Sequence, residues 1–210
     1  HEIKARYAGT ILGLTWSVLY PLLFLGLYAV VFIMIFQIRV GGFSTFDYVL
    51  LIFSGLIPFL GFSEALGTGV GSVLANKTLI KKTLFPIELI PVKAVLVSSL
   101  TMLVGLGMLL LILWGRGTIF LTQLLVPLVV VLQLLFTIGL IWILSALNVF
   151  FQDLGQTISV IILFLMLVSP IAYTIEMIPA NLMPFMYPNP LFYLIMLYRD
   201  ALVVGAVPVD

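Results

Sequence analysis

Long apolar runs separated by short polar segments form the main pattern along this chain. Residues 7–38, for example, contain no Asp, Glu, Lys or Arg. A helix that crosses a bilayer needs about 20 predominantly apolar residues, and each long run reaches roughly that length. The pattern predicts five transmembrane helices, at residues 16–36, 48–74, 94–114, 121–147 and 157–173.

The residues on either side of these spans follow other patterns. Ile3, Tyr7 and Ile11 share one helical face, with the charged side chains elsewhere, so residues 1–14 are expected to form an amphipathic interface helix. Prolines divide residues 177–204 into pieces too short to cross ~30 Å of hydrocarbon, which predicts two short re-entrant helices. A sixth span is expected after Asp210 in the full protein.

Composition narrows the fold class. Hydrophobic residues make up 63% of the 210 residues and charged residues only 8%, whereas soluble domains are about a quarter charged. Lipid must therefore be the solvent for most of the chain, and a backbone in lipid forms helices or a closed barrel. A barrel would show segments of alternating polarity. We therefore expect an all-α integral membrane bundle, a single transmembrane domain over residues 1–210.

The basic side chains predict the orientation of this bundle. If the N-terminus is cytoplasmic, six of them lie inside and three outside, as the positive-inside rule favours. The six are Lys4, Arg6, Lys77, Lys81, Lys82 and Lys93, and the three are Arg39, Arg116 and Arg199.

Aromatic residues recur every four positions along the first predicted span. Because aromatic faces stack on sugar rings, they could form a track for a sugar polymer. Lipid contact, interfacial anchoring and helix packing are the alternative interpretation. Glu64, the only charge in the second span, either lines a cavity or hydrogen-bonds a neighbouring helix. These candidate channel residues are Trp16, Tyr20, Phe24, Tyr28, Phe32, Phe36 and Glu64.

The polar segment at residues 75–93 is the part most typical of a partner-binding element. It holds several lysines and is divided by Pro86 and Pro91. It is either a positively charged anchor on the cytoplasmic side or a projection that docks into a soluble motor. The chain contains no Gly-x-x-x-x-Gly-Lys-Ser/Thr phosphate-binding loop, so energy for transport would come from a partner.

Six short motifs occur in order along nearly the whole chain. They are Glu2-Ile3-Lys4-Ala5-Arg6-Tyr7 with Leu12-Gly13, Trp16 and Pro21; Phe53-Ser54-Gly55-Leu56-Ile57-Pro58 with Ser63-Glu64-Ala65-Leu66; Asn76-Lys77-Thr78-Leu79-Ile80-Lys81-Lys82 with Phe85-Pro86; Asn148-Val149-Phe150-Phe151-Gln152-Asp153; Ser169-Pro170-Ile171; and Asn189-Pro190-Leu191 with Tyr198-Arg199-Asp200. Together they resemble the membrane permeases of polysaccharide-export ABC transporters, the ABC type-2 permease family. The family often has arginine at the position of Gln152.

The resemblance implies a homodimer with two cytoplasmic ATPase subunits beneath it. The channel would lie between the protomers, lined by the first and fifth spans. ATP and Mg would bind to the partner ATPase, and this chain would hold no cofactor and would not itself be an enzyme. The implied cargo is undecaprenyl-diphosphate-linked O-antigen, carried across the bacterial cytoplasmic (inner) membrane. The implied ATPase-coupling residues are Glu2, Lys4, Arg6 and Tyr7 in the interface helix, and Asn76, Lys77, Lys81, Lys82 and Phe85 in a coupling helix.

Other functions remain open on the sequence. A teichoic acid or capsular polysaccharide exporter shares much of the pattern, and an ABC exporter of a drug or small lipid could have the same fold. A membrane-embedded enzyme would need a cluster of acids, histidines or cysteines, but this chain has no cysteine and only His1. A secondary carrier is disfavoured because no second charge lies in the predicted spans.

Overall fold

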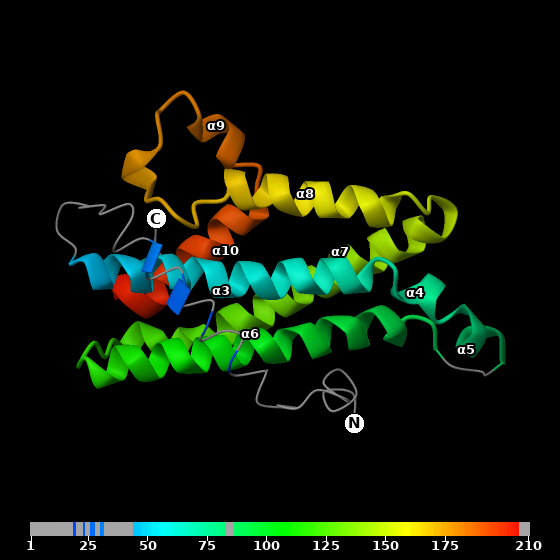
Figure 1. Cartoon of the computed structure of the whole chain (residues 1–210), viewed down its shortest axis with the longest axis horizontal. Helices are drawn as coiled ribbons and strands as arrows, with labels where there is room; N and C mark the ends of the chain where they lie inside the picture. The colour runs from blue at the N-terminus through cyan, green and yellow to red at the C-terminus, as the bar shows by residue number, and fades with distance from the viewer. Residues whose placement is uncertain are drawn as a thin grey trace.

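Helices make up most of the part of the chain that the structure describes. The computed structural model describes residues 19, 23, 26–27, 30–31, 44–82 and 86–205. Four helices run side by side as a bundle (Figure 1): α3 (Thr45–Gly69), α6 (Leu89–Gly115), α7 (Val126–Phe150) and α8 (Leu154–Val168). The predicted interface helix at 1–14 lies outside the described residues, as does most of the predicted span at 16–36.

Within the residues that the structure describes, three segments are long and apolar enough to cross a bilayer. They are Phe46–Gly69, Leu89–Gly115 and Leu121–Phe150, whereas α8 is apolar but shorter. Helices satisfy their own backbone hydrogen bonds, which is what a backbone surrounded by lipid requires. The helical membrane bundle predicted from composition is therefore confirmed.

Short elements cap the two ends of the bundle. At one end α4 (Ser72–Ala75) and α5 (Lys77–Lys82) follow α3 (Figure 1). The opposite end holds η3 (Leu121–Leu125), η4 (Ile175–Met177), α9 (Met183–Met186), α10 (Pro190–Arg199) and the π-helix η5 (Asp200–Val204).

Proline fixes where α8 ends. Ser169 has extended backbone angles, φ −80° and ψ 140°, because the ring of Pro170 disfavours a helical conformation in the residue before it. The helix therefore ends at Val168, five residues before the end of the predicted span at 157–173. A bent segment, residues 169–174, leads from there toward η4.

Helix α3 lies at the centre of the bundle. Its apolar span is 78% buried, against 39% for the span of α6 and 33% for that of α7. It packs against α6, α7, α8 and α10. The large apolar side chains exposed on α7 and α8, such as Leu135 and Leu167, suit contact with lipid.

Two glycines near the end of α3 provide a matched test of this packing. A Cβ on Gly69 would lie 2.7 Å from Ile141 Cγ2, whereas a Cβ on Gly67 would meet nothing within 4 Å. We expect Gly69→Ala to destabilise the bundle by about 1–3 kcal/mol through overpacking. Gly67→Ala should be neutral or stabilising by up to about 1 kcal/mol, because alanine favours the helix. Thermal unfolding in detergent checks both variants, and equal midpoints would contradict the close packing of α3 on α7.

Candidate functional site

The short basic helix α5 is the most exposed helix at its end of the bundle. None of its residues is buried, and Leu79 is 44% exposed. Its last turn carries Lys81 and Lys82, where positive charge interacts favourably with the helix dipole. Among the described helices, α5 makes its main contacts with α4 alone, and Figure 1 shows it beyond the ends of α6 and α7. It therefore presents its lysines, as well as apolar side chains, away from the bundle.

Asn76 joins this helix to α4. Its side-chain amide donates to the Ser72 carbonyl at 2.8 Å, and its own carbonyl accepts from the Ile80 backbone N–H at 3.1 Å. Helix α4 in turn packs against α6 and α7. A movement of α5 would therefore be transmitted through Asn76 and α4 to two of the long helices, α6 and α7.

A second exposed segment lies at the same end, between α7 and α8. Phe150 and Phe151 are 80% and 68% exposed, and Gln152 and Asp153 are also exposed. The turn is held by the Asn148 side-chain oxygen, which accepts from the Gly155 backbone N–H at 3.1 Å. This end of the bundle thus offers two projecting segments, each with apolar and charged side chains.

At the opposite end, buried side chains hold the bent segment that follows α8, residues 169–174. Arg199 is only 2% exposed, and it donates from Nη1 to the Tyr173 carbonyl and from Nη2 to the Ile171 carbonyl, both at 2.9 Å. The carbonyl between them, that of Ala172, accepts from Tyr48 Oη at 2.7 Å. Three consecutive carbonyls are thereby bound by side chains from α10 and α3. We call Arg199, Tyr48 and these carbonyls the Arg199 network.

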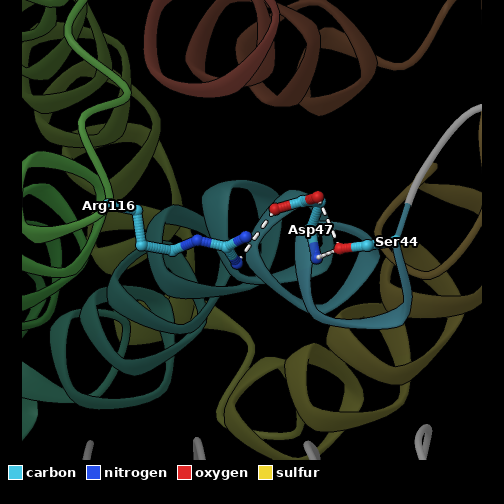
Figure 2. Close-up of polar contacts among 3 residues, drawn as sticks. All are labelled: Ser44, Asp47 and Arg116. Carbon is cyan, nitrogen blue, oxygen red and sulfur yellow. Dashed lines mark hydrogen bonds and ion pairs between the residues drawn. The ribbon is translucent and has the colours of Figure 1, made fainter.

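A second arginine at this end is held quite differently. Arg116 Nη1 lies 3.0 Å from Asp47 Oδ1, and both side chains are 39% exposed. Figure 2 shows the Arg116 guanidinium directed at Asp47, with Ser44 on the other side of that carboxylate. The guanidinium carbon also lies 4.7 Å from the centre of the Phe46 ring. Water screens such an exposed pair, so it contributes little to stability.

The structure brings some of the predicted site residues together and separates others. Lys77, Lys81 and Lys82 lie on α5, and Asn76 lies in the turn directly before it. Glu64 lies on α3, half-buried, within the bundle rather than on α5. The other predicted coupling and channel residues lie outside the described residues: Glu2, Lys4, Arg6, Tyr7, Phe85, Trp16, Tyr20, Phe24, Tyr28, Phe32 and Phe36.

The sequence did not indicate the Arg199 network. The positive-inside rule placed Arg199 among the three basic residues expected outside the membrane. Nothing in the local pattern showed that the Arg199 side chain is buried against backbone carbonyls. The signal that could have been used is an arginine within an apolar helix, because such a charge must find buried partners. Within residues 44–82 and 86–205, no group of three or more His, Asp or Glu side chains could hold a metal ion.

These features define a class of protein. The three bilayer-length helices of the described part of the chain, with a projecting basic helix at one end, are those of a multi-pass helical membrane protein. The chain belongs to the ABC-2 type transporter family, whose sequence profile matches residues 1–203. The resemblance drawn from the six motifs is thereby confirmed at the level of the family.

Relatives match the chain along nearly its whole length. The O-antigen export system permease protein RfbA of Klebsiella pneumoniae is 32% identical over 209 residues, which are 97% of this chain and 78% of the relative. The protein of the same name in Myxococcus xanthus is 32% identical over 183 residues, 84% of this chain and 66% of the relative. The polysialic acid transport protein KpsM of Escherichia coli is 27% identical over 217 residues, 97% of this chain and 79% of the relative.

Proposed function

We propose that this chain is the permease subunit of an ATP-driven exporter that moves undecaprenyl-diphosphate-linked O-antigen polysaccharide across the bacterial cytoplasmic membrane. The observation that carries the proposal is α5, a basic helix that buries none of its side chains in the bundle. A helix that contributes so little to its own fold suits contact with a partner. The cargo is supported by the name of the Klebsiella relative, O-antigen export system permease protein.

In this proposal the α5 end faces the cytoplasm. The N-terminus lies on the same side, together with Lys77, Lys81 and Lys82, in agreement with the positive-inside rule. Two cytoplasmic ATPase subunits bind ATP and Mg, and α5 seats in a cleft of one of them. The interface helix at residues 1–14 contributes a second contact through Glu2, Lys4, Arg6 and Tyr7.

ATP binding closes the ATPase subunits and moves α5. Because α4 packs against α6 and α7, that movement reaches the long helices and favours one of two arrangements of the bundle. Two copies of the chain pair, and the polymer passes between them. The aromatic row of the first span and Glu64 line this path in the proposal.

A capsular polymer is the second candidate cargo. It is favoured by the 27% identity to a polysialic acid transport protein over 97% of this chain. The O-antigen proposal ranks first because the identity to the export permease of that polymer is higher, at 32%.

Co-purification tests the energy source. When the chain is expressed with its neighbouring genes and purified in mild detergent, we expect an ATP-binding subunit to accompany it in equal amount. Native mass spectrometry should give a complex with two copies of each. A well-folded chain that purifies without an ATPase would overturn the proposal and favour a carrier that needs no ATP.

A further inference from the structure

A small cavity lies between α3, α6 and α7. Its volume is about 10 Å³, and its lining includes Gly61, Ala65, Ser99, Met102, Gln133 and Thr137. None of the lining residues is charged, and the polar ones come from α6 and α7. The site is separate from α5 and from the Arg199 network.

The side chain of Gln133, which lines this cavity, carries an oxygen that accepts no hydrogen bond from the described residues. The side chain is 2% exposed, and its Nε2 donates to the Pro58 carbonyl at 2.9 Å. Its Oε1 is buried and accepts no hydrogen bond from the part of the chain that the structure describes. Turning the amide over would set Oε1 against the Pro58 oxygen, and two acceptors repel each other. The orientation is therefore fixed, and Oε1 needs a donor from elsewhere.

The two hydroxyl groups that line the cavity cannot supply that donor. Ser99 Oγ donates its hydrogen to the Leu96 carbonyl at 2.7 Å, and Thr137 Oγ1 donates to the Gln133 carbonyl at 2.7 Å. A hydroxyl has only one hydrogen, so both oxygens can act only as acceptors toward the cavity. The side chains that line the cavity thus carry three acceptor oxygens, and the one donor left among them is the second Nε2 hydrogen of Gln133.

We propose that this cavity binds one water molecule, which donates one hydrogen bond to Gln133 Oε1 and one to Ser99 Oγ or Thr137 Oγ1. A buried water needs roughly 10–15 Å³ of space and two or more polar partners, which this site provides. Oxygen atoms can also coordinate a cation. A cation at this site would need a carboxylate to balance its charge, and none lines the cavity. The water completes the hydrogen bonding of the contact between Gln133 on α7 and Pro58 within α3.

Methionine oxidation gives a direct test, because Met102 lines the cavity and is only 3% exposed. X-ray radiolysis makes hydroxyl radicals from all water, bound water included, whereas photolysis of peroxide makes them only in bulk solvent. For the full chain in lipid nanodiscs, we expect X-rays to oxidise Met102 severalfold faster than bulk radicals of equal dose do. Met177, which is 46% exposed, should be oxidised at the same rate by both and serves as the reference.

The variant Gln133→Leu should remove the X-ray oxidation of Met102, because leucine offers no acceptor to hold the water. Gln156→Leu, on an exposed position of α8, is the control and should leave that oxidation unchanged. If Gln133→Leu does not fold, the comparison of the two radical sources in the unaltered chain still decides the matter. Met102 protected from both sources would overturn the proposal, as would Met102 oxidised equally by both. Loss of X-ray oxidation when sodium chloride replaces choline chloride would assign the site to a cation instead.

Discussion

Replacing α5 with a glycine–serine linker of the same length is expected to abolish stimulated ATP hydrolysis while leaving the membrane bundle folded. The bundle should persist because α5 contributes no buried side chain to it. Coupling should fail because the linker has neither the lysines nor the apolar side chains of Lys77–Lys82, and a flexible segment cannot transmit a push to α4. The measurement is ATPase activity of the reconstituted complex with and without lipid-linked polysaccharide, alongside the unfolding midpoint of the chain.

Two partial variants separate the contribution of the lysine charges of this helix from that of the side chains between them. In the first, Thr78, Leu79 and Ile80 become serine while the three lysines stay, which preserves the positive charge that sets orientation. In the second, Lys77, Lys81 and Lys82 become glutamine. We expect the first to lose most of the stimulated hydrolysis, because apolar side chains supply most of the energy of docking. Unchanged hydrolysis in the linker variant would remove α5 from the coupling path.

Among single substitutions at the end of the bundle opposite α5, Arg199→Met is expected to lower the stability most. The change leaves the buried carbonyl of Ile171 and the partly buried carbonyl of Tyr173 without their donors, and an unsatisfied buried group costs about 1–3 kcal/mol. We therefore expect a loss of roughly 2–5 kcal/mol, seen as a lower unfolding midpoint and less protein in the membrane. Arg199→Lys should recover only part of this, since an ammonium group cannot place two donors as a guanidinium does.

Arg116→Met is the matched control for that substitution. It removes the same kind of side chain at the same end of the bundle, but Arg116 and its partner Asp47 are both 39% exposed. An exposed pair contributes about 0–1 kcal/mol, so the midpoint should hardly move. Equal losses of stability in the two variants would mean that the carbonyl contacts of Arg199 stabilise the bundle no more than the exposed pair of Arg116 and Asp47 does.

Much of the bundle could be predicted from where apolar runs begin and end. Charge and proline divide the chain between α3 and α6, and these same residues gave the predicted cytoplasmic segment that contains α5. Helix ends were harder to predict. The predicted span at 48–74 is divided in the structure, where α3 ends at Gly69 and a turn at Val70 and Gly71 precedes α4. Hydropathy does not register such a turn, because both sides of it are apolar.

Polar side chains inside the bundle were the least predictable part of the molecule. Gln133 and Arg199 are each 2% exposed, and their partners lie 75 and 26–28 residues away along the chain. Local pattern cannot reveal such partners, because they depend on which helices pack together. The spacing of Gln133 and Thr137, four residues apart on one helix face, was the available hint that this face meets protein rather than lipid.

The proposed export of lipid-linked polysaccharide is tested most directly by locating that polymer after the gene is deleted. Lipid-linked polysaccharide is extracted from the cells, and surface polymer is quantified with an impermeant label. We expect the polymer to accumulate inside the cells and to disappear from their surface. The unaltered chain should restore export, whereas the chain with the linker in place of α5 should not. Normal surface polymer in the deletion strain, or loss of the polymer from both compartments, would overturn the proposed function.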